Sequence, residues 1–503
     1  MHPTYLLFVV LLITVAHCFH KPVYHFSAPH GTWINDPVGT IYFKGLYHLY
    51  YQFNPKSTSW GAPYWAHVYS HDLIHWKSLP NALEPSYPYE TAGCWSGSAF
   101  KFPHDHDDVY FWYTAAQPQT QCLAVSNDSL LQYFHRSSSN PILPFSAKPS
   151  QFNDAFRDPQ IFLAPDNSLV MILGTGIKET KKGAVIRYRS RDYNKSAGVY
   201  DWQYDGIVIK DEGQFPFDLL STWECPVVFK LPNTHDTFGL LISVEHDNPN
   251  TSYIIMGAMS DQDFDFVPSQ SFLFDPGVYA TRNFVMDSDD VILIGWVREF
   301  RENSEDFSGL FTLPRAVTLC KSSSMYVVYR ESKLFDSFCY AVPESVTSTL
   351  RSNHQSIQID KGHHQVIKTC ENKCELSVEI SNFKKFTQER IMISLFTSPD
   401  YRERTLLKFD FKTGAMSLVL THSSFSPNVS KDTVTVPLLF SSQQMNELSL
   451  SIFVDNSIVE IIANGRSLLT ARVYPSMKQS NLISLYSDSV DMKVDLYHYK
   501  KVF

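Results

Sequence analysis

The sequence is poor in the features that mark nucleic-acid-binding and disordered proteins. Of its 503 residues only 18% are charged, the formal net charge is −9, and Lys and Arg form no run of useful length. Nucleic acid is therefore a poor partner, because no basic field is present to attract a polyanion. There is no low-complexity tract either, and a neutral substrate fits this charge balance better.

Glycine is also scarce, with 20 residues against 28 prolines, and no long amphipathic helical pattern appears between residues 22 and 330. Aromatic residues, by contrast, make up 14% of the chain. This combination favours an aromatic-rich, all-β protein over a helical or disordered one.

Long apolar runs are absent except at the start of the chain. The apolar stretch from Tyr5 to Ala16 is followed by small residues, Ala16 and Cys18, at the usual cleavage spacing, although no Lys or Arg precedes it. We expect residues 1–18 to be a signal peptide, because a run of about 12 apolar residues is too short to span a bilayer. The sequence thus predicts a secreted, extracellular protein without a membrane span after signal removal. Glycosylation is predicted at the N-x-[ST] sites Asn127, Asn194, Asn250 and Asn428.

Cysteine is infrequent, with eight residues, of which Cys18 leaves with the signal peptide. The seven that remain are an odd number, so at least one is free. Cys370 with Cys374, and Cys320 with Cys339, are candidate pairs. The sequence does not fix the connectivity, and several cysteines could equally be buried thiols.

The length predicts two domains, since single cores rarely grow beyond about 250–300 residues. Residues 22–330 show short runs of β-formers broken by turns, as in GTIYFKGLYHLYYQFNP and DVYFWYTAA. So many strands suggest a closed or radial β architecture, and a propeller is one way to protect their edges. Residues 331–350 form a Ser-rich linker, and the alternating segments of residues 351–503, with a hairpin at Asn464-Gly465, suit a β-sandwich.

Three acids have similar neighbours: Asp36 in WINDPVG, Asp158 in FRDPQIF and Glu224 in TWECPVVF. Each is followed by Pro within two residues and lies in an apolar or aromatic setting, where a carboxylate is costly unless it is hydrogen-bonded or functional. The alternative is that Asp-Pro only opens a turn. Glycoside hydrolysis needs two carboxyl groups, and a radial β fold could bring distant acids to one central pocket.

The order of several motifs resembles that of the invertases and other β-fructofuranosidases of glycoside hydrolase family 32. These motifs are WINDPVG, YQFNP, W-G-x-x-x-W-A-H, S-x-D-L-x-H-W, WSGSA, FRDPQ and WECPVVF, followed by IGWVREF, GLFTLPRAVTL and IFVDNSIVEIIANGR…TARVYP. The resemblance runs from about residue 25 to the C-terminus. It implies a five-bladed β-propeller followed by a C-terminal β-sandwich, and a retaining glycosidase that releases fructose from sucrose and related sugars.

The resemblance also implies roles for individual residues. Asp36 would be the nucleophile, Asp158 the transition-state stabiliser that holds fructosyl hydroxyls, and Glu224 the general acid and then base. Sugar contacts are implied for Trp33, Asn35, Gln52, Trp60, Trp95, Ser96, Arg157, Tyr279 and Trp296. Aromatic faces suit the apolar side of a sugar ring and polar groups suit its hydroxyls, although the tryptophans could instead be core residues. Tyr279, in a segment shorter than its family counterpart, is the least secure of these contacts.

Three positions depart from the family pattern. Val38 replaces a usual Asn, Ala66 a common Gly, and Val227 an Asp found in many relatives, which puts the leaving-group side of the pocket and the tuning of Glu224 in question.

No cofactor or metal is expected, because the cluster from His104 to Asp108 is typical of a solvated hairpin tip. A fructan hydrolase or fructosyltransferase on the same scaffold, and a catalytically silent sugar-binding relative, remain alternatives.

Overall fold

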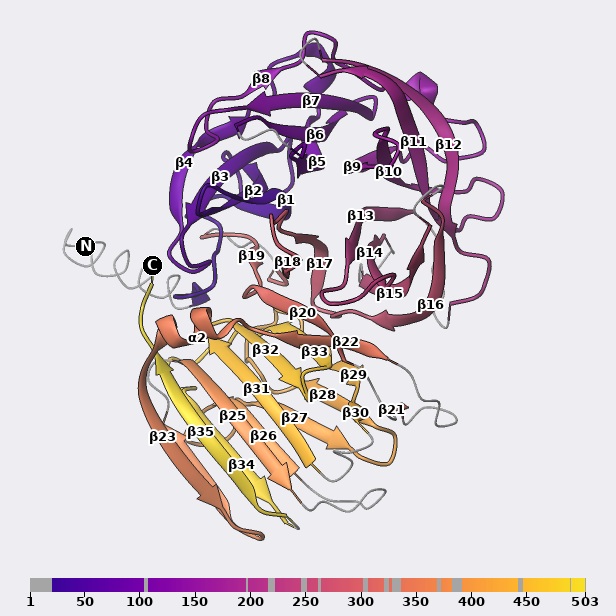
Figure 1. Cartoon of the computed structure of the whole chain (residues 1–503). Helices are drawn as coiled ribbons and strands as arrows, with labels where there is room; N and C mark the ends of the chain where they lie inside the picture. Colours follow the sequence, from indigo (N-terminus) through magenta and orange to yellow (C-terminus); the bar gives the residue numbers. More distant parts are fainter. Residues whose placement is uncertain are drawn as a thin grey trace, which may run out of the picture. The chain divides into compact units, whose positions relative to one another are not determined.

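The computed structural model describes residues 20–502, except 104–106, 196–197, 216–221, 246–250, 261–263, 302–305, 321–324, 328–335, 369–371, 382–390, 442–446 and 489. The described residues are almost wholly β-structure and divide into two compact units (Figure 1). The propeller unit comprises Thr32–Trp296 and Phe311–Leu319. The sandwich unit comprises the residues up to Gly31, Val297–Leu310 and the chain from Cys320 onward.

The propeller unit is built from five antiparallel sheets arranged radially (Figure 1). The first sheet contains β1 (Trp33–Phe43), β2 (Leu46–Asn54), β3 (Tyr64–Ser70) and β4 (Lys77–Leu83). The second contains β5 (Gly93–Phe100), β6 (Val109–Ala116), β7 (Thr120–Ser126) and β8 (His135–Arg136). The third contains β9 (Arg157–Leu163), β10 (Leu169–Gly176), β11 (Gly183–Asn194) and β12 (Val199–Lys210). The fourth contains β13 (Trp223–Lys230), β14 (Phe238–Val244), β15 (Thr251–Met259) and β16 (Phe266–Leu273). The fifth includes β17 (Val278–Asn283), β18 (Val291–Val297) and β20 (Arg315–Cys320), with β19 (Leu310–Phe311) between the last two in the chain.

The first strand of each sheet lies at the centre of the unit. β1 contacts β5, β5 contacts β9, β9 contacts β13, β13 contacts β17, and β17 contacts β1. These contacts close a ring, so the unit is a five-bladed β-propeller and each sheet is one blade. The ring leaves the inner strands without free edges, which is the physical advantage of a closed β architecture.

The core of the propeller unit lies between neighbouring blades. One buried cluster joins Trp112 of the second blade to Tyr188 and Trp202 of the third. A blade that packs on two neighbours buries both of its faces, so its middle strands are continuous apolar runs instead of alternating ones. Strand β6, VYFWYTAA, is buried at every position. This explains why periodicity alone does not count the blades.

The sandwich unit contains two six-stranded antiparallel sheets (Figure 1). One has the order β23 (Arg351–Ile359), β35 (Met492–Tyr499), β25 (Lys373–Ser381), β31 (Glu447–Asp455), β32 (Ile458–Ala463) and β33 (Ser467–Arg472). The other has the order β24 (His364–Lys368), β34 (Leu482–Ser487), β26 (Ile391–Thr397), β27 (Thr405–Asp410), β28 (Ala415–Val419) and β29 (Val434–Pro437). A short pair, β21 (Met325–Val327) and β30 (Leu439–Ser441), accompanies them. The prediction of an all-β chain with a five-bladed propeller and a C-terminal sandwich is confirmed.

The stretch predicted as a linker carries regular structure of its own. It holds strand β22 (Ser337–Ala341) and helix α2 (Glu344–Leu350), in which Phe338, Tyr340 and Leu350 are buried. These apolar side chains anchor a segment whose serines suggested a plain connection. Within the described residues, the other helical pieces, apart from a turn at residue 20, are short 3₁₀ turns at Pro88–Glu90 and Phe145–Ala147. Among the described residues, no helix is long and apolar enough to cross a membrane.

The structure tests part of what the sequence predicts for the cysteines and for the N-x-[ST] glycosylation sites. Cys320 and Cys339 form a disulfide, whereas Cys94, Cys122 and Cys225 are buried free thiols, so the expected free cysteine is confirmed. Cys374 is buried, and its candidate partner Cys370 lies outside the described residues. The asparagines of three predicted glycosylation sites, Asn127, Asn194 and Asn428, are exposed, and Asn250 lies outside the described residues.

A buried histidine fixes the start of the described chain within the sandwich unit. His25 is bonded through Nδ1 to Asp455 Oδ2 and through Nε2 to Glu460 Oε1, each at 2.9 Å. The backbone N–H groups of Val23 and Tyr24 also donate to the Asp455 carboxylate, at 2.8 and 2.9 Å. Burial alone would lower the pKa of His25, but the two carboxylates outweigh it and raise that pKa from 6.5 to about 9.

We predict that the free energy of unfolding depends on this histidine in a defined pH window. Because the folded-state pKa is raised, the contribution of His25 is complete below pH 6.5 and is lost as the pH rises through about 9. His25→Gln leaves two buried carboxylates without their cation and is expected to cost about 3–5 kcal/mol near neutral pH. Denaturant unfolding between pH 6 and 10 measures both effects, with the exposed His30→Gln as the matched control. An equal loss of stability at all pH values would contradict the prediction.

Candidate active site

The candidate acids lie on the inner strands of the propeller unit, and each sits where its strand departs from regular pairing. The register between β1 and β2 shifts between Ile34 and Pro37, so Asp36 falls inside the irregular segment. The same occurs between Arg157 and Gln160 on β9 and between Glu224 and Val227 on β13. A fourth shift on β5, between Cys94 and Gly97, contains Trp95 and Ser96.

Proline or left-handed backbone accompanies each of the three irregular segments that hold the acids. Pro37, Pro159 and Pro226 have no N–H group and cannot donate to a ladder, and each stands within or at the edge of one of these segments. Asp158 and Cys225 moreover adopt φ values of 66° and 48°, a conformation that non-glycine residues rarely take. Such bulges turn side chains out of the sheet, and here they turn acids toward the central axis. The Asp-Pro pattern in the sequence is therefore the local cause of the site.

Asp36 is buried and held by three donors. Ser96 Oγ donates to its Oδ2 at 2.5 Å, Asn35 Nδ2 donates to Oδ1 at 3.2 Å, and the Cys225 thiol donates to Oδ2 at 3.4 Å. Burial raises the pKa of Asp36, the Ser96 hydrogen bond lowers it, and the charges of Asp158 and Glu224 raise it again, to about 6. Asp36 is thus a carboxylate at and above neutral pH.

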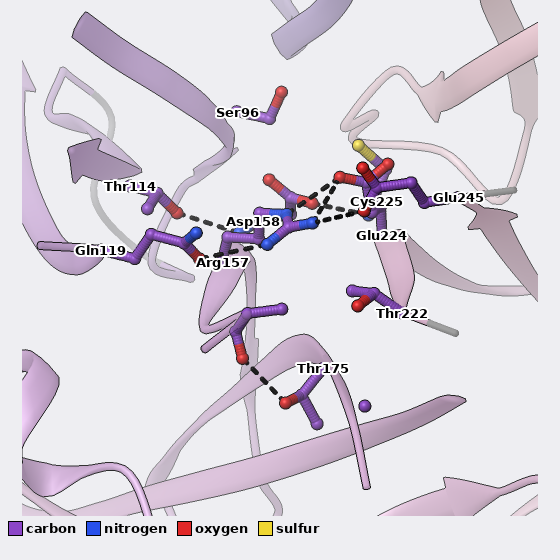
Figure 2. Close-up of polar contacts among 12 residues, drawn as sticks. Ser96, Thr114, Gln119, Arg157, Asp158, Thr175, Thr222, Glu224, Cys225 and Glu245 are labelled. Atoms are coloured by element: carbon purple, nitrogen blue, oxygen red, sulfur yellow. Dashed lines mark hydrogen bonds and ion pairs between the residues drawn. The ribbon is translucent and has the colours of Figure 1, made fainter. Parts of the chain in front are cut away.

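Glu224 is held at both carboxylate oxygens (Figure 2 shows the arginine side). Its Oε1 accepts two hydrogen bonds from Arg157, from Nε at 2.9 Å and from Nη2 at 2.7 Å. Its Oε2 accepts the hydroxyl of Tyr279. Burial raises the pKa of Tyr279 well above its usual value, so this hydroxyl keeps its proton and donates. The carboxyl group is fixed in direction, while its side chain remains 19% exposed to the cavity.

Asp158 lies deeper than Glu224 and is bonded to backbone as well as to side chains. Its Oδ2 accepts the Cys225 N–H at 2.8 Å, and its own N–H donates to Thr114 Oγ1 at 2.9 Å (Figure 2). Burial raises the pKa of Asp158, Arg157 lowers it, and the charge of Glu224 raises it. One residue, Cys225, therefore binds both aspartates: Asp36 through sulfur and Asp158 through the main chain.

The acids open into a cavity of about 640 Å³ within the propeller unit. Eleven of the twelve predicted site residues line it: Asn35, Asp36, Gln52, Trp60, Trp95, Ser96, Arg157, Asp158, Glu224, Tyr279 and Trp296. The twelfth, Trp33, is not among the lining residues, but its Nε1 donates to Asn35 Oδ1 at 3.2 Å. Its ring also meets that of Trp296 edge to face, with centroids 5.8 Å apart.

The rim of this cavity is aromatic and its wall is amide-rich. Trp60, in the loop between β2 and β3, is 52% exposed and meets Trp95 edge to face, at 6.1 Å between centroids. Below them Gln52 donates to Ser96 Oγ at 3.0 Å and accepts from Asn35. An aromatic mouth above hydrogen-bonding groups suits a ligand with apolar faces and many hydroxyls.

Several cavity residues had no signal that singled them out in the sequence. Gln119 Oε1 accepts Arg157 Nη1 at 3.3 Å, and Glu245 Oε2 accepts Arg157 Nη2 at the same distance (Figure 2). The charge of Glu224 raises the pKa of Glu245. Other lining residues that the sequence did not single out are Asn153, Asp154, Ala155 and Thr222. Gln119 and Glu245 lie beside β7 and β14, outside the motifs. Asn153 and Asp154 are separated from the FRDPQ motif by Ala155 alone and could have been noted for that reason.

The three departures from the family pattern lie behind the cavity. Val38, Ala66 and Val227 are all buried, and none of them lines it. Val227 therefore contributes no side chain to the described lining of the cavity. As for metals, the described residues include no group of three or more His, Cys, Asp or Glu that could hold an ion, and residues 104–106 are outside the described part.

Comparison with known proteins covers nearly the whole chain. Residues 25–329 match the glycosyl hydrolases family 32 N-terminal domain, and residues 344–500 match the glycosyl hydrolases family 32 C-terminal domain. A cell wall β-fructofuranosidase of Pisum sativum is 28% identical, over 91% of this chain and 89% of the relative. A fructan 6-exohydrolase of Beta vulgaris is also 28% identical, over 93% of this chain and 84% of the relative.

The fold is shared with solved structures at lower identity. The crystal structure of fructan 1-exohydrolase IIa from Cichorium intybus superposes with a TM-score of 0.80 at 20% identity, over 96% of this chain and 98% of that one. Since the two family domains match in order and together span both the propeller strands and the sandwich strands, the chain belongs to glycosyl hydrolase family 32.

Proposed function

We propose that the protein is a retaining β-fructofuranosidase that hydrolyses sucrose and related β-fructosides, with Asp36 as nucleophile and Glu224 as acid/base. One observation carries these roles: Asp36 and Glu224 project into one cavity from β1 and β13, and hydrogen-bond donors hold each carboxyl group in a fixed direction. Asp36 is held as an acceptor by Ser96 and Cys225. Glu224 is aimed by Arg157 and Tyr279.

In the first step a carboxylate oxygen of Asp36 attacks the anomeric carbon of the fructosyl group and forms an ester. Glu224 gives its proton to the glycosidic oxygen, so the glucose leaves as an alcohol instead of an alkoxide. Asp158, buried beside them, accepts hydrogen bonds from fructosyl hydroxyls that strengthen as the ring becomes oxocarbenium-like. In the second step Glu224, now ionised, takes a proton from water, and the water cleaves the ester.

The polar wall and aromatic rim are proposed to bind the sugar. Asn35, Gln52 and Ser96 meet hydroxyls of the fructosyl ring, while Trp60 and Trp95 offer ring faces at the entrance. Tyr279 and Trp296 complete the aromatic lining around them, and Trp33, which is bonded to Asn35 and packs on Trp296, is proposed to support this sugar site. Names among the relatives include both β-fructofuranosidases and fructan exohydrolases, so sucrose and terminal fructan units are the substrates to compare.

We further propose that catalysis belongs to residues 22–330 and that the protein acts outside the cell. All the described residues that line the cavity belong to the propeller unit. The cell wall location in the name of the pea relative and the predicted signal peptide support an extracellular site of action. A catalytically silent sugar-binding protein is disfavoured, because all three acids are present and converge on the cavity.

Replacing the proposed nucleophile tests the function directly. Asp36→Asn is nearly isosteric but cannot form the ester, so hydrolysis of sucrose should fall at least a hundredfold while thermal unfolding stays unchanged. Release of reducing sugar from sucrose, raffinose and inulin by the wild type sets the reference and ranks the substrates. A variant that kept more than about a hundredth of the wild-type rate would rule out Asp36 as nucleophile.

The pH dependence of kcat/KM tests the environment of Asp36. The nucleophile must be ionised and its pKa is about 6, so kcat/KM should fall as the pH drops below 6. Ser96→Ala removes the hydrogen bond that lowers this pKa, and the acidic limb should therefore move to higher pH. Ser98→Ala, two residues along the same strand, is the control. A limb that moved to lower pH in Ser96→Ala would contradict the assignment.

The general-acid and general-base roles of Glu224 can be separated with a substrate that has a better leaving group. With sucrose, Glu224→Ala should lose on the order of a hundredfold to ten-thousandfold in rate. With an aryl fructoside the leaving group needs little protonation, so ester formation is spared and ester breakdown becomes limiting. Added azide, which needs no general base, should restore turnover and give a β-fructosyl azide. An α-product would mean inversion, and the absence of any azide product would mean that Glu224 is not the acid/base.

A further inference from the structure

A second cavity lies at the opposite ends of the five inner strands. It has a volume of about 490 Å³ and shares no residue with the cavity that holds the carboxylates. Each cavity is lined by a different part of the same strands. On β1, Asp36 lines the first cavity and Gly39 lines the second. On β13, Glu224 lines the first cavity and Val228 lines the second. The side chains that separate the two cavities form the floor of the active site.

Arg282, on β17, lies at this floor. It lines the second cavity but is only 3% exposed, and its Nη1 donates to the Pro226 carbonyl at 3.2 Å. Its Nε and Nη2 are buried and have no hydrogen-bond partner among the described residues. Keeping a guanidinium buried with so few hydrogen bonds is costly, so a compensating role is expected for its charge.

The carbonyl that Arg282 binds belongs to the irregular segment of β13. Cys225, the residue before Pro226, has a left-handed backbone, and its N–H donates to Asp158 at 2.8 Å. Its thiol donates to Asp36 at 3.4 Å. A shift of the Cys225–Pro226 peptide would therefore move the donors of two proposed catalytic groups at once.

We propose that Arg282 is a positioning residue for hydrolysis: it holds the Cys225–Pro226 segment from beneath and places a positive charge opposite the buried Asp158. The inference rests on the proposed roles of Asp36, Asp158 and Glu224. Arg282 touches neither the cavity of the carboxylates nor the reacting atoms, so it acts through Cys225 and through its charge.

The charge of Arg282 acts on Asp158 together with the other ionisable groups described near that carboxyl. These groups are Asp36 on β1, Arg157 on β9, Glu224 and Cys225 on β13, Glu245 after β14, and Arg282 on β17. Burial and Glu224 raise the pKa of Asp158, while Arg157 and Arg282 lower it. Loss of the Arg282 charge would raise that pKa, so Asp158 would ionise only at higher pH. A purely structural role of Arg282 would not move the pH profile.

The test compares three variants of the full-length protein on sucrose. Arg282→Met removes both charge and hydrogen bonds, Arg282→Lys keeps the charge, and Lys101→Met is the matched control. Lys101 lines the same second cavity, but its ammonium pairs with the exposed Asp287 and does not reach β13. Measured quantities are kcat and KM between pH 4 and 8 and thermal unfolding.

We expect kcat of Arg282→Met to fall by about a hundredfold, which is what small displacements of reacting groups can cost. Its KM should change by less than about threefold, and its acidic limb should move to higher pH. Arg282→Lys should keep the acidic limb of the pH profile at its wild-type position, and its kcat should be about tenfold higher than that of Arg282→Met. Lys101→Met should match the wild type in kcat, KM and pH profile.

Two results would overturn the proposal. One is a folded Arg282→Met protein with kcat within about threefold of wild type. The other is an equal loss in the Met and Lys variants with no change in the acidic limb. If Arg282→Met does not fold, Arg282→Gln replaces it, since it retains a donor for Pro226 and removes only the charge. A wild-type protein without activity on sucrose or fructans would instead refute the proposed function.

Discussion

The repulsion among carboxylates buried at one point is the constraint on which the centre of the propeller depends. Asp36, Asp158 and Glu224 share a cavity, and the charges of the latter two raise the pKa of the first. Charges that close together in a poorly hydrated site would protonate or push the strands apart unless donors and cations offset them. Arg157 and Arg282 supply the positive charge, and Ser96, Tyr279 and Cys225 supply the donors. Each carboxyl group is thereby held in place by its own set of hydrogen-bond donors.

The same constraint explains the backbone of the inner strands. Regular antiparallel strands would direct alternate side chains toward neighbouring blades, away from the axis. A bulge next to Pro37, Pro159 or Pro226 turns the preceding residues inward. Beyond it β9 and β13 resume their pairing, whereas β1 has a second irregularity between Val38 and Ile41 before its pairing resumes. The strain of left-handed backbone at Asp158 and Cys225 is confined to these bulges, between blades whose apolar faces are packed.

How much could be predicted depended on whether a signal was local. The Asp-Pro and Glu-Cys-Pro segments, with their aromatic neighbours, pointed to the acids, and the motif order gave the family and the number of blades. Tyr279 was the least secure sugar contact, yet it is bonded directly to Glu224. Glu245 and Gln119 reach the cavity from outer connections that no short pattern marks. Arg282 was missed for another reason. Its partner is a backbone carbonyl on a different blade, and because every residue has a backbone carbonyl, no residue type in the sequence indicates this hydrogen bond.

The exposed position of Trp60 has a consequence for how this protein could diversify. Trp60 stands in a loop between β2 and β3, whereas the acids stand on strands that the closed ring holds from both sides. Changes in that loop alter the mouth of the cavity without passing through the packed interior of a blade, so natural variation can accumulate there at little cost to folding. If the proposed sugar contacts hold, the preference among sugars of different length can drift between descendants of such a gene while the proposed reaction is inherited intact.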